Sequence, residues 1–356
     1  MKSPLLFAAF LLVGATLRAE KIVLVTGGGD KEKDAPAAQC ALHEPFGVEF
    51  TPAGEMIIAE MEHGNRVLKV DAQGMLRAFA GTGVKGYSGD GGPAVSATFN
   101  GIHNLAITSG GNLLIADSFN HTLRKIDAKT GVISTFAGNG LKGFAGDGGP
   151  AAQAQFVILI QIALDPPGKH LYIADIGNHR IRRIDLATGL ITTVAGNGKS
   201  GVPSDGADAT SAPLFDPRAV TPDAAGGFYI LERNGNALRY VDPAGKIRTV
   251  VGTGAKGLSG DGGPALQATM SGPKYLTLDR DGSVLIADAE NHVIRRYSPK
   301  TGLITRVAGT GKAGAAGIGG DPLQCELRRP HGVTIGPDGA LYITDSYNDR
   351  ILKIVP

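Results

Sequence analysis

The sequence predicts an all-β protein, a six-bladed β-propeller with four antiparallel strands in each blade and a ring closed by the N-terminal strand. Two unrelated motifs recur along the chain at the same interval of about 57 residues. Each interval holds four short strand-like segments separated by turn residues. The last interval lacks its fourth segment, and a segment of that kind stands near the N-terminus.

Residues 1–19 are predicted to be a signal peptide. Lys2 gives a positive start, an apolar run extends over residues 4–15, and residues 17–19 form a cleavage site. The apolar run is short for a membrane-spanning helix, and no second run follows it. We therefore expect residues 20–356 to be exported, into a periplasm or outside the cell. The alternative interpretation is an uncleaved membrane anchor.

The charge argues against two classes of partner. The formal net charge of +2 falls to 0 when Lys2 and Arg18 leave with the signal peptide. A neutral chain has no general electrostatic attraction for nucleic acid or for an anionic membrane. We expect a monomer that binds neither. The 53 glycines show no collagen period and indicate many tight turns.

A tandem repeat organises the chain. Tripeptides such as Ile-Ala-Asp end in an acid at spacings of 57, 58, 57, 56 and 57 residues, and a Gly in Ala-Gly-Thr/Asn-Gly keeps the same rhythm. Two independent markers with one spacing exclude composition bias. The acids are Glu60, Asp117, Asp175, Glu232, Asp288 and Asp345, and the glycines are Gly81, Gly138, Gly196, Gly252 and Gly309.

The second unit shows the blade pattern most clearly. Strands are expected at residues 104–107, 112–117, 122–127 and 131–137, each apolar or β-branched and bounded by Gly, Asp or Asn. No segment keeps a helical period of 3.6 residues. Four antiparallel strands repeated around an axis form the blade of a propeller, which leaves only short edges unpaired.

The chain ends predict how the ring closes. The sixth unit begins at Pro330 and reaches the C-terminus after three strands, and residues 21–27 resemble the missing fourth strand. Residues 20–28 are therefore expected to complete blade six, within one domain over residues 20–356. Closure removes the two unpaired edges that an open array would expose.

Further motifs indicate a family. Asn-His begins the third strand of three units, at residues 120–121, 178–179 and 291–292, and Pro-x-Gly-Val precedes the first strand at residues 45–48 and 330–333. With these motifs the chain resembles the NHL-repeat propellers, over residues 20–356. Such propellers serve as binding modules, sensors and, less often, enzymes, so the resemblance implies the fold and leaves the function open.

Long Gly-Asp-Gly-Gly-Pro-Ala loops, at residues 89–94, 146–151 and 260–265, are similar to those of exported bacterial NHL proteins. Their Asp-Gly steps allow a calcium hypothesis. The loops lack the alternating oxygen ligands of a dedicated calcium site, which favours a structural turn capped by Asp.

The candidate site is expected at the positions where the residue type differs from one repeat unit to the next. In a propeller the first strand of each blade lines the channel, and its beginning lies at one rim. The first position of that strand holds Phe46, His103, Ile160, Arg218, Lys274 and His331, and the next holds Gly47, Asn104, Gln161, Ala219, Tyr275 and Gly332.

The polar residues of these two positions predict a partly cationic channel mouth. They are His103, Asn104, Gln161, Arg218, Lys274, Tyr275 and His331. Such a mouth suits an anionic or polyhydroxylated small ligand, or a peptide carboxylate. The alternative is that these side chains are simply solvated at a wide opening.

A metal site is the second hypothesis for the mouth. Some similar propellers resemble peptidyl-amidoglycolate lyase, with zinc held by channel histidines, or gluconolactonase-type hydrolases. His103, His331 and Glu49 are the candidate ligands for Zn or Ca. Catalytic zinc usually has three protein ligands, and a third histidine is missing.

Other repeated residues are expected to be structural. His121, His179 and His292 occupy one equivalent position and suit a hydrogen bond to a neighbouring blade, and the ring of acids suits a similar role. Cys40 and Cys325 are also equivalent, in loops of blades one and six, and are predicted to form a disulfide across the closure. Equivalent positions on adjacent blades can also lie too far apart to bond.

Two functions follow. The first is an exported recognition or scaffold module that binds a protein, peptide or glycan over one rim. The second is a metal-dependent lyase or hydrolase in the channel mouth. The apolar residues 157–160 replace the Pro or Gly of other units, and a hydrophobic contact surface is one explanation.

Overall fold

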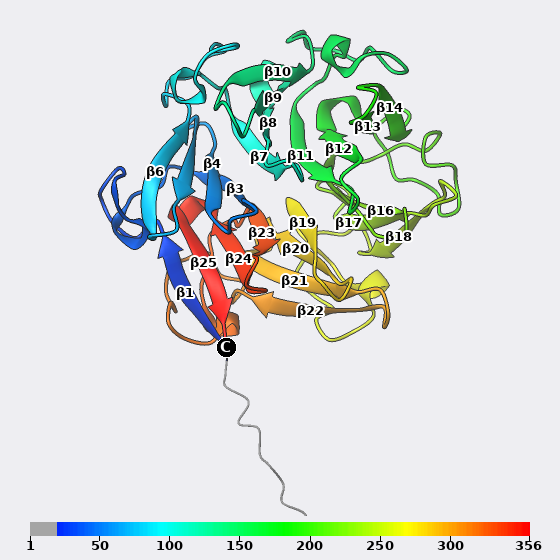
Figure 1. Ribbon diagram of the computed structural model, residues 1–356. Coiled ribbons are helices and arrows are strands. Elements are labelled where there is room, and N and C mark those ends of the chain that lie inside the picture. Colours follow the sequence, from blue (N-terminus) through cyan, green and yellow to red (C-terminus); the bar gives the residue numbers. More distant parts are fainter. Residues whose placement is uncertain (1–19) are drawn as a thin grey trace, which may run out of the picture.

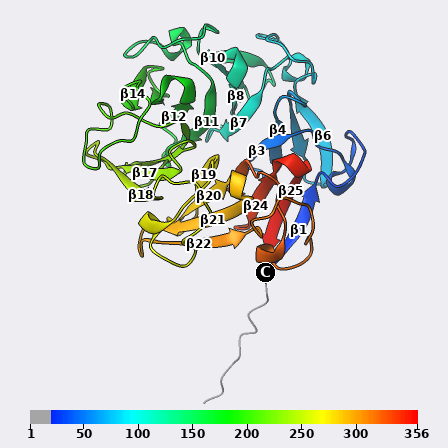
Figure 2. The ribbon, with the colours of Figure 1, turned by 180° about the vertical axis from the view of Figure 1, so that it is seen from behind.

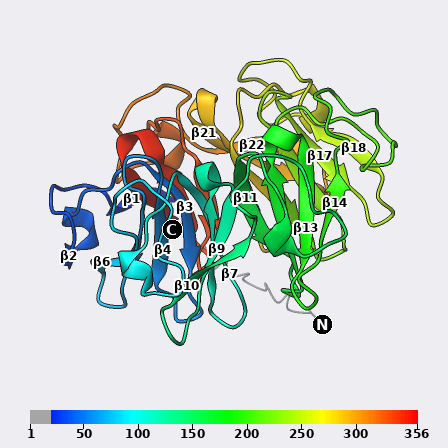
Figure 3. The same cartoon turned by 90° about the horizontal axis from the view of Figure 1, so that it is seen from above.

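The computed structural model describes residues 20–356, so the predicted signal peptide at 1–19 lies outside the described residues. Six antiparallel sheets stand around a central channel (Figure 1). Seen from the side, the ring is a thick disc with loops projecting beyond the strands (Figure 3). Over residues 20–356, no helix has the length and apolar character to cross a membrane.

Blades one to three follow the predicted order of strands. In blade two each observed boundary lies within two residues of the expected one. The strands are β3 (Pro45–Phe50), β4 (Met56–Glu60), β5 (Arg66–Val70) and β6 (Met75–Ala80); β7 (Ile102–Ile107), β8 (Leu113–Asp117), β9 (Thr122–Ile126) and β10 (Ile133–Ala137); β11 (Leu159–Leu164), β12 (His170–Asp175), β13 (Arg180–Asp185) and β14 (Ile191–Ala195). A two-residue strand, β2 (Ala35–Pro36), pairs with β6.

Blades four to six repeat the arrangement. Their strands are β15 (Pro217–Pro222), β16 (Phe228–Glu232), β17 (Ala237–Val241) and β18 (Ile247–Val251); β19 (Tyr275–Leu278), β20 (Val284–Asp288), β21 (Val293–Ser298) and β22 (Leu303–Ala308); β23 (Gly332–Ile335), β24 (Leu341–Asp345), β25 (Arg350–Val355) and β1 (Lys21–Thr26). Short 3-10 turns follow the second strand of four blades, at Ser118–Asn120, Ile176–Asn178, Ala289–Asn291 and Ser346–Asn348.

The predicted ring closure is confirmed. β1 pairs antiparallel with β25, with Ile22 opposite Ile354 and Leu24 opposite Leu352. Figures 1 and 2 show this N-terminal strand lying beside the C-terminal one from both sides. The first and last segments of the chain therefore share one sheet, in the order β1-β25-β24-β23.

The hydrophobic core is divided among the interfaces between blades. One cluster joins blades five and six and contains Ile22, Leu285 and Ile343, all fully buried. A second joins blades six and one and contains Ile58, Leu68 and Ile351. Because a single blade exposes two apolar faces, each blade needs both neighbours to remove that surface from water.

The repeated acids have the structural role predicted for them. Asp117 accepts the backbone N–H of Asn100, in the loop that leads into its own blade, at 2.8 Å. Glu232 accepts the N–H of Phe215 at 2.8 Å, and Asp345 accepts that of Arg328 at 2.6 Å. Each acid therefore fixes the chain where it turns into the channel-lining strand.

The Asp of the glycine-rich loops pairs with a buried arginine. Arg124 Nη2 lies 2.6 Å from Asp90 Oδ1, and Arg124 Nη1 lies 3.5 Å from Asp117 Oδ2. Asp90 also accepts the N–H of Thr135 at 3.0 Å. Its carboxylate thus ties the loop to the outer strands of blade two, in agreement with the structural interpretation.

Two of the three repeated histidines bridge neighbouring blades as expected. His121 Nδ1 accepts the N–H of Ile158 at 3.4 Å, and His292 Nδ1 accepts the N–H of Arg329 at 3.1 Å. His179 differs, because its buried Nδ1 has no hydrogen-bond partner within residues 20–356.

The predicted disulfide is wrong in this structure. Cys40 and Cys325 are both buried free thiols. Cys40 lies in the core between blades six and one, and Cys325 lies in the core between blades five and six. Blade six therefore lies between the two thiols. Equivalent positions on adjacent blades are too far apart for a disulfide bond.

Closure can be tested at Ile22. Ile22→Ala is expected to lower the free energy of unfolding by about 2–5 kcal/mol, because it leaves a cavity between blades five and six. Val23→Ala, on the half-buried face of the same strand, should cost much less. Urea unfolding measures both, and equal costs would contradict the buried pairing of β1.

Candidate functional site

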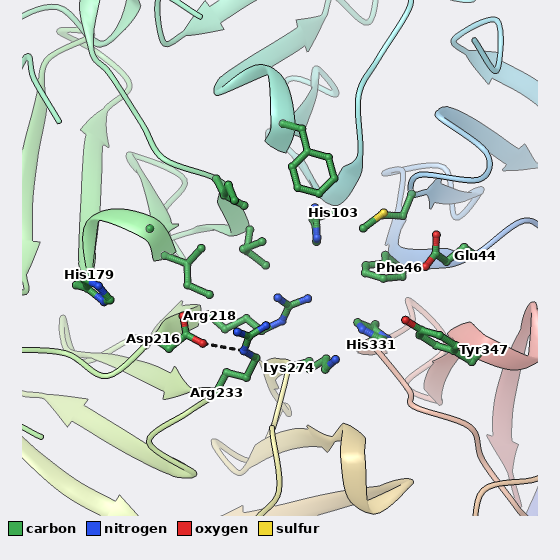
Figure 4. A pocket seen from close by; sticks show the side chains of 16 residues that line it. Glu44, Phe46, His103, His179, Asp216, Arg218, Arg233, Lys274, His331 and Tyr347 are labelled. Atoms are coloured by element: carbon green, nitrogen blue, oxygen red, sulfur yellow. Dashed lines mark hydrogen bonds and ion pairs between the residues drawn. The ribbon is translucent and has the colours of Figure 1, made fainter. Parts of the chain in front are cut away.

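A cavity of about 410 Å³ occupies one end of the channel. Figure 4 shows side chains from several blades converging on it. Four of the seven predicted ligand-binding residues line it, and each has no more than 7% of its surface exposed: His103, Arg218, Lys274 and His331. The other lining residues are Glu44, Phe46, Met61, Phe119, Ile158, Ile160, Ile176, Gly177, His179, Asp216, Arg233 and Tyr347.

β-Bulges place several of these side chains. The pairing of the first and second strands slips between Ile102 and Asn104 in blade two, and between Pro217 and Ala219 in blade four. The residue between each pair, His103 or Arg218, is left outside the ladder. A bulge bends the strand and redirects its side chain, and here both side chains reach the channel mouth.

Arg218 carries the charge of the site. It is 6% exposed, and its guanidinium has no hydrogen-bond or ion-pair partner within residues 20–356; its Nε is fully buried. Burial, with a smaller contribution from nearby Arg233, lowers the pKa of Arg218 to about 10. The side chain is still a cation at neutral pH. The charge of the Asp216 carboxylate acts on it, but that carboxylate forms its ion pair with Arg233.

The neighbouring cations have ion-pair partners, unlike Arg218. Lys274 Nζ lies 3.0 Å from Glu290 Oε1, and Arg329 Nη2 lies 2.6 Å from the same oxygen. Arg233 Nε pairs with Asp216 Oδ2 at 2.7 Å, the dashed contact in Figure 4. Burial and the field of Arg218 lower the pKa of Lys274 to about 8.

The two histidines are neutral hydrogen-bond acceptors. His103 Nδ1 lies 3.2 Å from the carbonyl oxygen of Gly101, and His331 Nδ1 lies 2.8 Å from that of Arg329, so each Nδ1 carries the proton. Burial lowers the pKa of His103 to about 3 and holds the pKa of His331 well below its usual range. Each Nε2 therefore keeps a lone pair.

Aromatic rings form one wall. Phe46 stacks on His331 with the ring centroids 4.0 Å apart, and its edge meets His103 at 5.4 Å. Tyr347 lies on the other side of His331 at 5.6 Å. These contacts fix the orientation of both imidazoles.

Comparison with known proteins fits the repeat and the ring. The family model of the NHL repeat matches residues 327–354. NHL repeat-containing protein 2 of Bos taurus is 26% identical over 329 residues, which cover 84% of this chain and 44% of that protein. This chain is an NHL-repeat β-propeller.

Two further proteins are similar to this NHL propeller. Protein SUPPRESSOR OF QUENCHING 1, chloroplastic, of Arabidopsis thaliana is 30% identical over 270 residues, which cover 72% of this chain and 25% of that protein. The propeller thus spans less than half the length of these relatives. An auxiliary nutrient binding protein from Bacteroides thetaiotaomicron superposes with a TM-score of 0.70 at 16% identity, over 94% of this chain and 76% of that one. At this identity the likeness shows the fold alone.

Strained backbone borders the pocket of the NHL propeller. The position two residues before the mouth is left-handed in all six blades, and it is glycine in only two of them, Gly101 and Gly272. Glu44, Ile158 and Asp216 take that conformation with φ of 53°, 56° and 63°, and all three line the pocket. Each such residue costs about 1–3 kcal/mol, and strain of this kind concentrates at functional sites.

The strained positions explain the unusual residues 157–160. Ile158 and Ile160 line the pocket and contribute apolar side chains to its wall. Two of the four residues of the apolar stretch therefore belong to the pocket wall, and Leu159 is buried in the core between blades two and three.

The loops between the second and third strands also contribute pocket residues, and these were not predicted from the sequence. Met61, Phe119, Ile176, Arg233 and Tyr347 all lie there. Sequence variation could have identified these loop residues, because the two positions after each repeated acid differ from unit to unit.

Three predicted mouth residues lie deeper. Asn104 Nδ2 donates to the Tyr275 hydroxyl oxygen at 2.9 Å, which joins blade two to the opposite blade five. Gln161 Nε2 donates to the Leu276 carbonyl oxygen at 2.9 Å. Asn104, Gln161 and Tyr275 therefore cross-link the channel below the mouth pocket.

The three proposed metal ligands do not come together. His103 and His331 line the mouth pocket, whereas Glu49 lines a separate cavity with Gln161 and Tyr275. Within residues 20–356, no group of three or more His, Cys, Asp or Glu side chains is placed to hold a metal ion. The separation arises because Glu49 stands three positions farther along its strand than the mouth residues.

Acid should destabilise the propeller through the buried histidine. Below pH 6.5 the unfolded chain protonates His103 while the folded chain does not, so stability falls as the pH falls. His103→Gln removes this effect. The loss of unfolding free energy caused by His103→Gln should therefore be about 1 kcal/mol smaller at pH 5.5 than at pH 7.

The control for this comparison is His63→Gln, since the His63 side chain is 78% exposed. Urea unfolding of both variants at the two pH values measures the difference. A pH-independent cost of His103→Gln would show that His103 takes up a proton as readily in the folded state as in the unfolded state, which would contradict the prediction.

Proposed function

We propose that this NHL propeller is an exported recognition module that binds a small organic carboxylate, or the acidic end of a peptide or glycan, in the mouth pocket. The observation that carries the proposal is the buried, unpaired guanidinium of Arg218.

A buried cation without a partner is costly to keep. Arginine presents donors in a planar fork that matches the two oxygens of a carboxylate. A bound carboxylate would satisfy Arg218 and lie within the field of Lys274. Such a ligand would also offset the positive charge of Arg218.

The rest of the pocket selects what lies beside the carboxylate. The free Nε2 atoms of His103 and His331 accept hydrogen bonds, so they favour a ligand with hydroxyl or N–H groups. Phe46, Ile158 and Tyr347 offer apolar surface to its body. The volume of about 410 Å³ suits a small molecule or one terminal unit of a larger ligand.

Binding is favoured over metal-dependent catalysis by the donors that are present. The mouth has an anion-binding group and two fixed acceptors, and within residues 20–356 no three His, Cys, Asp or Glu side chains are placed together to hold a metal ion.

Replacement of Arg218 should increase the stability of the unliganded protein and weaken carboxylate binding. Arg218→Gln is expected to raise the unfolding free energy of the unliganded protein by about 1–3 kcal/mol, because it removes an unsatisfied buried cation. The same variant should bind carboxylates at least about tenfold more weakly, since hydrogen bonds to charged groups contribute about 1.5–3 kcal/mol.

Calorimetric titration with lactate, glucuronate and hippurate measures the affinity, and the corresponding amides test the need for charge. Arg183→Gln is the matched control, because Arg183 lies on β13 outside the pocket. An amide that binds as well as its acid, or an equal loss in Arg183→Gln, would refute the proposal.

Carboxylate affinity should also depend on Lys274. Because its pKa is about 8, the ammonium loses its charge as the pH rises from 7 to 9.5. The affinity for the carboxylate should fall by about threefold or more over this range. A threefold change corresponds to a rise of about half a unit in the pKa of Lys274 when the ligand binds. Titrations with Lys274→Met should show no such fall, and a persisting fall would assign it to another group.

A further inference from the structure

A second cavity, of about 220 Å³, lies along the channel beyond the residues that cross-link it. We call it the inner chamber. Five blades contribute their first strands to its wall, which is formed by Glu49, Ala106, Ile107, Gln161, Ile162, Ala163, Leu164, Thr221, Tyr275 and Thr277. The role proposed below for this chamber does not depend on the function proposed for the mouth.

The inner chamber has one ionisable acid and no basic side chain in its wall. Glu49 forms no ion pair within residues 20–356, in contrast to the paired acids around the mouth. Burial raises the pKa of Glu49 to about 7. Tyr275 is the only other titratable group in the wall, and its pKa is raised by burial and by Glu49. The chamber is thus opposite in charge to the mouth pocket.

One residue of the chamber wall, Gln161, carries an unpartnered acceptor. Gln161 is 3% exposed, and its amide nitrogen donates to Leu276, whereas its Oε1 is buried without a hydrogen-bond partner within residues 20–356. The Tyr275 hydroxyl oxygen already accepts from Asn104. A buried oxygen of this kind calls for a donor from a ligand or from water.

Solvent reaches the inner chamber from the end of the channel opposite the mouth. Glu49, Ile107, Leu164 and Thr277 are only half-buried. Since one water molecule occupies about 30 Å³ in the liquid, the chamber holds on the order of seven water-sized groups. This is room for a small organic molecule.

We propose that the inner chamber binds a small primary ammonium ion, with its N–H groups donated to the Glu49 carboxylate and Gln161 Oε1 and its short carbon chain against Ile107 and Leu164.

The charge and size of the chamber favour this ligand over a divalent metal. One carboxylate balances one positive charge, whereas calcium sites use six to eight oxygens and usually several carboxylates. An ammonium group brings donors in several directions, which suits acceptors from two blades.

The experiment uses the full mature chain and propylammonium chloride as the probe, with binding followed by calorimetric titration at pH 8. We expect one site per chain, with a dissociation constant in the millimolar range. Affinity should fall at least about tenfold in Glu49→Gln and also at pH 6, where Glu49 is protonated; a tenfold loss corresponds to about 1.4 kcal/mol.

Two variants keep the result interpretable. Glu55→Gln removes a carboxylate of the same hairpin that pairs with Lys69 at 2.9 Å outside the chamber, and it should bind normally. Ala163→Leu leaves Glu49 in place and fills the chamber, so it should abolish binding even if Glu49→Gln does not fold. Thermal unfolding of each variant checks the fold.

The proposal is overturned by three results. The first is that propylammonium does not bind saturably, and the second is that Glu49→Gln or Ala163→Leu binds it as tightly as the unsubstituted protein does. The third is that sodium or calcium binds more tightly than propylammonium at the same site. Because the mouth pocket is tested with carboxylates, failure of one site leaves the other unaffected.

Discussion

The structure depends on closure of the ring. Each blade has two apolar faces, and the core exists only as six clusters between neighbouring blades. The pairing of β1 with β25 completes the sixth blade and so the last two interfaces. Without it, blade six would lose its outer strand and expose a sheet edge to water. The channel and both cavities exist because the ring is closed.

The repeat separates stability from function within each blade. Residues that recur in every unit hold the scaffold, as Asp117 does when it fixes the loop that leads into its blade. Residues that differ between units line the channel, and several of them are energetically unfavourable where they stand. Arg218 is a buried charge without a partner, and Ile158 is a β-branched residue in a left-handed conformation. Such costs indicate selection for something other than stability.

The channel contains two cavities of opposite character. The mouth has an unpaired cation and neutral acceptors, whereas the inner chamber has an unpaired acid and an unsatisfied amide oxygen. Hydrogen bonds from Asn104 to Tyr275 and from Gln161 to Leu276 cross the channel between them. These bonds join blades that are distant in the sequence, so they both brace the ring and keep the two cavities apart.

The repeat spacing and the strand pattern were enough to predict the fold, the number of blades and the strand that closes the ring, because both are properties of the linear chain. The sequence also identified His103, Arg218, Lys274 and His331, since variation at one repeat position is visible without coordinates. Tertiary structure decided the rest. Bulges directed side chains that the alternation of a regular strand would have placed elsewhere, and hydrogen bonds across the ring took Asn104, Gln161 and Tyr275 out of the mouth. The distance between Cys40 and Cys325, and the missing partner of Arg218, depend on how blades pack in space, which a repeat pattern does not encode.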